Sequence, residues 1–244
     1  MLNKLKILNL IVVCFLIGSC TDLSYQAVDS TVVTPGAAGS VGKASDLITT
    51  LYAQLGRIQD SQNDTWSLSE MVSDEQLGPT RGTDWSDNGQ LRSLHTHTWN
   101  SQHPFLLPTW NNLNTAVYQA NVALTAADIT EAQKGEARFL RAFFMNFIVD
   151  YWGVAPFREV TEGVGVDPKV LTRVEALAFI TADLNAAIAS LPECTDIGRA
   201  SKTAARALLA KVLINKAVWT AANPAGPYSF APADMDQVIA LADQ

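Results

Sequence analysis

The sequence has little basic charge and none of the short motifs that mark common catalytic chemistries. Seventeen lysines and arginines stand against 24 acidic residues, which gives a net charge of −7 over 244 residues. Without a basic surplus the chain has little to neutralise phosphates, which argues against a nucleic-acid partner. The patterns G-x-S-x-G, H-E-x-x-H and G-x-x-x-x-G-K-[ST] are missing, so nothing in the sequence supports catalysis.

Long apolar runs are also missing from the body of the chain. No segment after the N-terminus approaches eighteen consecutive apolar residues, the length that a transmembrane helix needs. The chain is nevertheless 48% hydrophobic, which is enough to build a sizeable core. We therefore expect a folded body with no membrane span of its own.

The N-terminus has the pattern of a bacterial lipoprotein signal. Lys4 and Lys6 precede an apolar run over 7–17, which is too short to remain as a membrane-spanning helix. It closes on Ile17-Gly18-Ser19-Cys20, which resembles a lipobox, with an aliphatic residue and two small residues before the cysteine. This pattern predicts that residues 1–19 are removed and that Cys20 carries lipid. The alternative is an ordinary secretory signal with an incidental cysteine.

Cysteine is scarce as well, and removal of the signal leaves little of it. Of three cysteines, Cys14 leaves with the signal, Cys20 carries the lipid and Cys194 remains in the body. A single remaining thiol excludes an internal disulfide, and Cys194 in a connecting loop is interpreted as a bystander. Residues 20–43, rich in Ser, Thr, Val, Gly and Pro after the anchor, are predicted to be an extended tether.

Helical periodicity dominates from residue 44 onward. Thr109 is a candidate N-cap, and Thr172 with Glu175 has the spacing of a capping box. Two further helices are predicted to start at about Thr130 and at Ser201. We predict a mostly α-helical, tetratricopeptide-like scaffold of helix pairs with long irregular ligand-binding loops. The last helix reaches the end of the sequence without a C-cap, so we expect residues 44–244 to be part of a longer domain. The predicted helices cover 44–59, about 109–124, 130–152, 172–191, 201–219 and the stretch after Pro232.

Ordered blocks along almost the whole chain resemble the SusD/RagB family. The likeness begins directly after the lipobox and continues in the same order as in that family. The matching residues are Thr21-Asp22-Leu23, Trp110 with Leu113, Ala120-Asn121, 136–144, 150–157, 172–175, Asp183-Leu184, Leu191-Pro192, 198–202 and 205–212. The arginines of this pattern, Arg138 and Arg141, lie on an aromatic-rich helical stripe and are predicted to serve packing.

The resemblance implies a surface-exposed, lipid-anchored protein of the bacterial outer membrane. Such proteins capture oligosaccharides, or peptides in some branches, and deliver them to a TonB-dependent transporter without catalysis or a cofactor. The alternative from another class is a helical-repeat envelope lipoprotein that serves only as a protein–protein scaffold. A third possibility, a secreted hydrolase, would need two carboxyls at a fixed separation, and neighbours such as Asp74-Glu75 do not show that.

The segment 60–108 is predicted to be one long irregular loop that carries the ligand site. Sugar rings present apolar faces that stack on indole, while their hydroxyls need polar side chains beside the ring. Trp85 between two carboxylates is the best platform, whereas Trp110 on a helical stripe is predicted to be core. The predicted ligand-binding residues are Arg81, Asp84, Trp85, Asp87, Asn88, Trp99, Asn100 and Trp66.

Histidine offers the one hint of a metal site in the same segment. His95 and His97 would point the same way on a strand, and His103 follows nearby. A zinc or copper site needs three or four ligands with supporting contacts. Because no cysteine and no further ligand at helical spacing accompany them, no metal is predicted.

Overall fold

The computed structural model describes residues 42–78, 87–163, 165–193, 197–223 and 225–243. Several predicted features lie outside the described residues: the signal, Cys20, nearly all of the tether, Arg81, Asp84, Trp85 and Cys194. Of Asp87 only the backbone is described. These predictions therefore remain predictions.

The described part of the chain is mostly α-helical, which confirms the predicted fold class. Two short strands, β1 and β2, add an antiparallel pair in which Val154 faces Thr172 and Phe157 faces Lys169. The elements are α2 (Ala44–Asp60), α3 (Thr65–Glu70), a 3₁₀ turn η1 (Asp87–Gly89), α4 (Gln90–His95), α5 (Leu106–Ala123), α6 (Glu131–Trp152), β1 (Val154–Phe157), β2 (Lys169–Thr172), α7 (Arg173–Ser190), α8 (Lys202–Trp219) and α9 (Pro232–Ala242).

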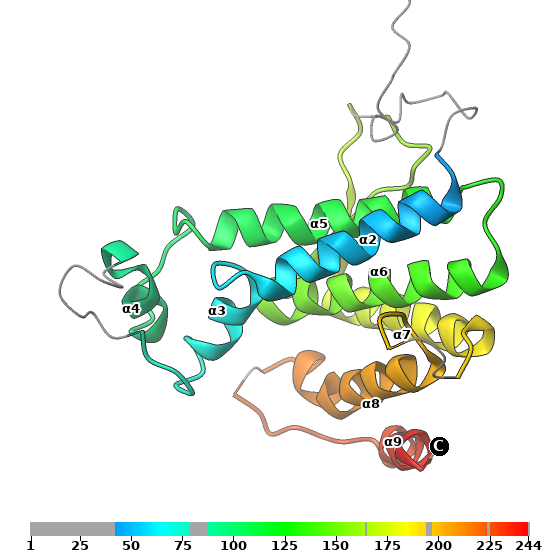
Figure 1. Ribbon diagram of the computed structural model, residues 1–244. Coiled ribbons are helices and arrows are strands. Elements are labelled where there is room, and N and C mark those ends of the chain that lie inside the picture. Colours follow the sequence, from blue (N-terminus) through cyan, green and yellow to red (C-terminus); the bar gives the residue numbers. More distant parts are fainter. Residues whose placement is uncertain (1–41, 79–86, 164, 194–196, 224, 244) are drawn as a thin grey trace, which may run out of the picture. The chain divides into compact units, whose positions relative to one another are not determined.

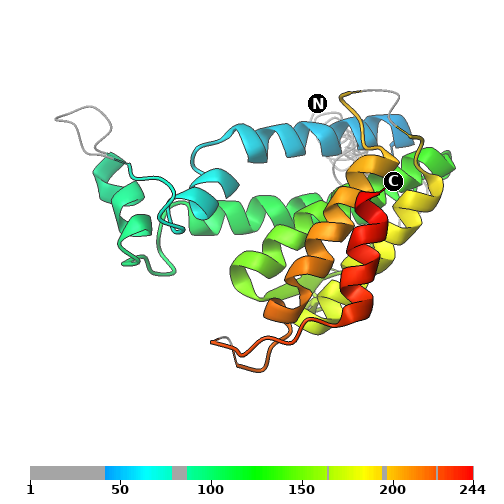
Figure 2. The same ribbon diagram turned by 90° about the horizontal axis from the view of Figure 1, so that it is seen from below.

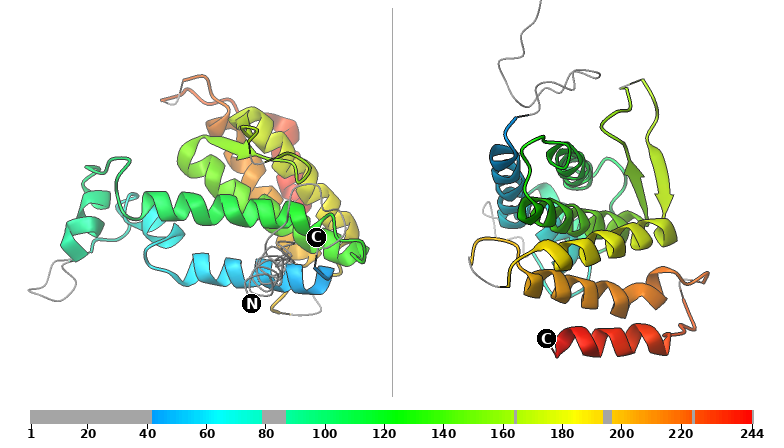
Figure 3. Two further views of the ribbon diagram at one scale, coloured as in Figure 1. Left: turned by 90° about the horizontal axis from the view of Figure 1, so that it is seen from above. Right: turned by 90° about the vertical axis from the view of Figure 1, so that its right-hand side faces the viewer.

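The long helices form a row in sequence order. Helix α5 packs against α2 and α6, and α7, α8 and α9 then follow, each against its predecessor. Figures 2 and 3 show the same succession from other directions, with α9 on the outer side of α8. In the described residues, no helix combines the length and the apolar character that crossing a membrane requires. The row of helix pairs agrees with the predicted tetratricopeptide-like scaffold.

Close approach between α6 and α7 depends on a glycine. A Cβ atom on Gly135 would lie 2.7 Å from Ser190 Oγ and 3.0 Å from Leu191 Cγ. Any larger residue would push the two helices apart, because these distances are well inside van der Waals contact. This is the small-residue contact that helix pairs of this type need.

A buried charge network joins α5, α6 and α7 inside the row. The Arg141 guanidinium donates to both carboxylate oxygens of Asp183 at 2.7 Å and to Asn121 Oδ1 at 2.7 Å. Its guanidinium carbon also lies 4.7 Å from the centre of the Phe179 ring. Arg141 therefore serves packing, as the sequence pattern predicts.

Three of the predicted helix starts are confirmed by their caps. Thr130 and Thr172 each form a complete capping box with the residue three positions later, and the Ser201 side chain accepts from Ala204 N. Helix α6 ends at Gly153, whose φ of 74° places it in the left-handed region that favours glycine. The starts of α6, α7 and α8 and the end of α6 are therefore predictable from the local sequence.

Two predictions are wrong, one about the segment 60–108 and one about the helix that follows it. The segment is not one irregular loop, because α3, η1, α4 and the first turn of α5 lie within it. Thr109 is not an N-cap: α5 begins at Leu106, and Thr109 is buried within the helix. Pro108 is tolerated there because backbone N–H groups in the first turn have no partner within the helix.

Candidate functional site

Helix α3 is only six residues long, and hydrogen bonds to three long helices hold it in place. Asn112 Nδ2 of α5 donates to Asp64 Oδ2 at 2.8 Å, just before α3 begins. Thr65 Oγ1 donates to the Ile58 carbonyl of α2 at 3.1 Å, and the Tyr151 hydroxyl of α6 donates to the Thr65 carbonyl at 3.0 Å. The position of α3 is therefore set by its hydrogen bonds to α2, α5 and α6.

A small second core joins α3 to α4. It is separate from the main core of the helix row, and its members come from α3, from α4 and from the residues just after α3 or before α5. Apolar burial of this kind is the main favourable term available to two helices of six residues each. The buried members are Leu68, Met71, Leu91, Leu94 and Phe105.

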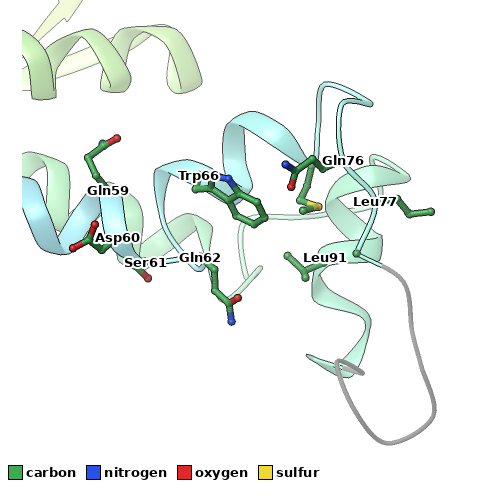
Figure 4. A pocket seen from close by; sticks show the side chains of 10 residues that line it. Gln59, Asp60, Ser61, Gln62, Trp66, Gln76, Leu77 and Leu91 are labelled. Carbon is green, nitrogen blue, oxygen red and sulfur yellow. The ribbon is translucent and has the colours of Figure 1, made fainter.

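A cleft of about 540 Å³ opens beside Trp66 on one side of this segment. The neighbours of Trp66 in the chain, Thr65 and Ser67, are buried, whereas Trp66 itself is 37% exposed. Figure 4 shows its indole ring with the Gln76 side chain beside it, while Gln62 extends away from the ring and Leu91 of α4 also lines the cleft. An exposed indole with amides in the same cleft offers a stacking face and hydrogen-bonding groups together.

Polar groups of this Trp66 cleft remain available to a ligand. Within the described part of the chain, the side chains of Asp60, Gln62 and Gln76 form no hydrogen bond. Gln59 is different, since its Nε2 donates to Thr65 Oγ1 at 3.1 Å. The cleft thus combines one fixed amide with three uncommitted polar side chains.

A second cleft, of about 410 Å³, opens beside Trp99. Trp99 is 39% exposed, and its ring meets that of His97 edge-on at 5.1 Å between centroids. His97 Nε2 lies 3.0 Å from the Val72 carbonyl oxygen, which ties the residues after α4 to those after α3. The lining residues are Leu68, Ser69, Val72, Leu94, Trp99, Leu106, Asp150, Tyr151 and Trp152.

Asp150 is the one carboxylate of the Trp99 cleft. Trp219 Nε1 of α8 donates to its Oδ1 at 3.2 Å. Partial desolvation raises the pKa of Asp150, while the Trp219 hydrogen bond and the charges of Lys211 and Arg173 act in the opposite direction. No cation lies within ion-pair distance of Asp150 among the described residues.

Burial also changes the protonation behaviour of the groups around α3. It raises the pKa of Tyr151, which therefore stays protonated at neutral pH and remains a donor to the Thr65 carbonyl. The single Tyr151 proton is thereby used, so the Ser69 hydroxyl, 2.5 Å away, donates to the Tyr151 oxygen. Burial raises the pKa of Asp64 too, and the Asn112 hydrogen bond lowers it in part.

The structure does not bring the predicted site residues together. Trp66 and Trp99 each line a cleft, but the two clefts share no lining residue. Asn88 is exposed at η1 with a φ of 54°, and Asn100 Oδ1 accepts from Gln102 N at 2.8 Å; neither lines the Trp66 cleft or the Trp99 cleft. Whether any of these residues binds a ligand stays a prediction.

The three histidines have different interaction partners. His95 ends α4 with Nδ1 3.6 Å from Asp74 Oδ1, and His97 follows with a φ of 55°, so the His-Thr-His stretch is not a strand. His103 is buried, with Nε2 3.0 Å from Ser93 Oγ. Among the described residues, no three metal-binding side chains come together.

Sequence reasoning missed most of the cleft residues. Asp60 and Gln62 directly follow the apolar stripe of α2, and Tyr151 and Trp152 end the aromatic stripe of α6. Nothing in the sequence around Asp60 and Gln62, apart from its polar composition, indicates that these residues line a cleft. Tyr151 and Trp152 could have been recognised, because aromatic rings at the C-terminal end of a helical apolar stripe can extend beyond the core.

The comparison with protein families gives one match over most of the chain. A family model described as SusD-like, "Starch-binding associating with outer membrane", matches residues 36–214. The chain is 32% identical over 122 residues to a SusD-like protein of Bacteroides ovatus, covering 45% of this chain and 22% of the relative. It is 28% identical over 164 residues to the starch-binding protein SusD of Bacteroides thetaiotaomicron, covering 64% and 28%. The chain thus matches about a quarter of the length of these relatives.

Solved structures have the same fold. A SusD homologue from Bacteroides thetaiotaomicron superposes with a TM-score of 0.61 at 21% identity, over 89% of this chain and 42% of that one. A laminarin-binding SusD-like protein gives a TM-score of 0.58 at 20% identity, over 71% and 40%. Since the family model matches well over half of the residues, this chain belongs to the SusD-like family, as the ordered sequence blocks indicate.

Proposed function

We propose that this chain binds a glycan in the Trp66 cleft as part of a lipid-anchored outer-membrane protein. The observation that carries the proposal is the exposed Trp66 indole in a cleft that the uncommitted side chains of Gln62 and Gln76 also line. The apolar face of a sugar ring stacks on the indole, and the amides and the Asp60 carboxylate meet its hydroxyls. Binding of this kind needs no covalent step.

The wider role follows from the family. One relative is named a starch-binding protein and one structural neighbour a laminarin-binding protein, so we propose a neutral oligosaccharide as ligand. Lipidation at Cys20 would hold the protein at the outer membrane, on the cell surface, and the ligand would pass to a TonB-dependent transporter. If no gene for such a transporter lies beside the gene of this protein, delivery is contradicted while binding is not.

Calorimetric titration of the whole chain tests binding. We expect heat with at least one of malto-, laminari- or xyloglucan oligosaccharides. Replacing Trp66 by alanine should weaken binding at its cleft about tenfold or more, which corresponds to about 1.4 kcal/mol, because the stacking face is lost. The matched control is Phe230→Ala, which removes an aromatic ring that is 48% exposed and lines neither cleft.

The same titration distinguishes the alternatives. Absence of heat with every glycan and with a peptide mixture would reject the proposal and favour the helical-repeat scaffold that contacts only proteins. Binding to peptides alone would keep a nutrient-binding role but exclude a glycan as the ligand. Equal loss in Trp66→Ala and Phe230→Ala would show that the effect does not come from the cleft.

A further inference from the structure

The two tryptophan clefts lie on different sides of α3. Successive residues of an α-helix are rotated by about 100° around its axis, so Trp66 and Leu68 project about 200° apart. Trp66 lines the first cleft and Leu68 the second. In α4, Leu91 lines the first cleft and Leu94 the second, although the two residues lie only about 60° apart around the helix, and both belong to the small core. The small core of α3 and α4 therefore separates the two clefts.

The Trp99 cleft has its own stacking surface. Trp99 comes from the segment after α4, whereas Tyr151 and Trp152 come from the end of α6, so three aromatic rings from two elements line one cavity. The Trp152 ring is supported edge-on by Trp110 at 5.0 Å between centroids, and Tyr151 is held through its hydroxyl. Rings fixed in this way lose little conformational freedom when a ligand stacks on them.

Asp150 gives this cleft a hydrogen-bond acceptor. Its Oδ1 accepts from Trp219, and its Oδ2 has no hydrogen-bond partner among the described residues. The positive charges of Lys211 of α8 and Arg173 of α7 act on this carboxylate and lower its pKa, against the effect of burial. A sugar hydroxyl can donate a hydrogen bond to the unpaired Oδ2.

We propose that the Trp99 cleft is a second glycan-binding site, independent of the Trp66 cleft. The inference rests on the proposed function, since it assigns the same class of neutral oligosaccharide to both clefts. Because α3 and α4 stand between them, one short oligosaccharide occupies one cleft only. A single chain thus binds two short oligosaccharides at once.

Stoichiometry tests this inference directly. Calorimetry of the whole chain with the shortest oligosaccharide that binds should give two ligands per chain. Trp66→Ala and Trp99→Ala should each leave one site at its original affinity and weaken the other about tenfold or more; the double variant should leave no site at its original affinity, and Phe230→Ala should leave two. Asp150→Asn retains the shape of the side chain but removes its charge, so it should weaken one of the two sites several-fold and leave the other unchanged.

Each other outcome separates this inference from the proposed function. One ligand per chain, lost in Trp66→Ala and unaffected by Trp99→Ala and Asp150→Asn, overturns the second site and leaves the first standing. One ligand, lost in Trp99→Ala and unaffected by Trp66→Ala, overturns both the assignment of the first cleft and the claim of two sites. No binding by the unaltered chain removes the proposed function and the inference together. Circular dichroism of each variant establishes that it is folded.

Discussion

The helix row α5–α8 and the segment that contains α3 and α4 are stabilised in different ways. In the row, helices of 18 to 22 residues pack against their neighbours around one large core. Side-chain caps start α6, α7 and α8, and the Arg141–Asp183 pair crosses the interior. Local sequence and tertiary packing thus favour the same structure.

The α3–α4 segment has neither long helices nor side-chain caps. Its helices have six residues each, and neither the Asp64 position before α3 nor Gly89 before α4 provides a capping hydrogen bond. Helices so short are unstable in isolation. Five buried side chains and a few hydrogen bonds from α2, α5 and α6 hold the segment together.

This difference in stabilisation coincides with the location of the two clefts. Both tryptophan clefts are lined by residues of α3 and α4, while the row contributes only Leu106 and the end of α6, and α2 contributes its last residues. The segment with little local stability therefore provides the exposed aromatic rings, and the row provides a fixed base for it. This arrangement is typical of binding sites positioned by a rigid scaffold.

Breaking the buried Arg141–Asp183 pair should have the largest effect on stability. Arg141→Met leaves the Asp183 carboxylate, 6% exposed, without its guanidinium partner. We expect a loss of about 3–5 kcal/mol in the free energy of unfolding, because an unpaired buried charge is strongly destabilising. Urea denaturation followed by circular dichroism measures it. Lys134→Ala, which removes an exposed ion pair of the same helix, should leave the urea midpoint unchanged; equal effects would contradict a special role of burial.

A substitution in the small core should destabilise the α3–α4 segment without destabilising the helix row. Leu94→Ala removes a fully buried side chain and should cost about 2–5 kcal/mol, confined to α3 and α4. Hydrogen–deuterium exchange should become faster at residues 65–70 and 90–95 and stay unchanged in α6 and α7. Binding at both clefts should weaken, because Leu94 supports the helices that line them.

Leu107→Ala is the matched control for this core substitution. Leu107 is 57% exposed in the first turn of α5, so its removal should change exchange nowhere. If Leu94→Ala instead accelerated exchange in α6 and α7 as much as in α3, the segment and the row would form one cooperative unit. The comparison between them would then be wrong.

The same difference explains how much of the structure was predictable. Helices of 17 residues or more give several turns of apolar periodicity, and Thr130, Thr172, Ser201 and Gly153 mark their ends. Helices α3 and α4 have fewer than two turns each, so no periodicity can develop in them. A positive φ at Asn88 and Gly89 sets the turn into α4 and has no helical signature in sequence.

Of the residues that line the two clefts, the sequence singled out only Trp66 and Trp99 as ligand-binding residues. Exposed Trp66 and Trp99 follow from their position in a polar segment rich in Gly, Asn and Asp. Their separation into two clefts depends on the rotation of α3 about its axis, which Asn112 and Tyr151 impose from distant parts of the chain. A contact between residues 48 or 86 positions apart leaves no trace in a local pattern.

The smallest of these expected effects belongs to the cap of α7, which lies in the row. Thr172 Oγ1 accepts from Glu175 N, and a Glu175 carboxylate oxygen accepts from Thr172 N at 2.9 Å. Thr172→Ala should cost about 1 kcal/mol, which thermal denaturation can resolve. Thr49→Ala, in the interior of α2, is the control, since its hydroxyl bonds a carbonyl within the helix rather than an end.

The pH dependence of the cap separates its two halves. The Thr172 hydrogen bonds and the charge of Lys169 lower the pKa of Glu175 below its ordinary value near 4.5. A lowered pKa means that the ionised carboxylate stabilises the folded state, so this contribution is present above pH 4.5 and is lost as the pH falls through the lowered value. The difference in melting temperature between the unaltered chain and Thr172→Ala should therefore shrink in acid. If it stayed constant from pH 7 to pH 3, the hydrogen bond from the Thr172 hydroxyl to the ionised Glu175 carboxylate would contribute nothing to the cap; the bond from the backbone N–H of residue 172 to the same carboxylate is present in both proteins and does not enter the difference.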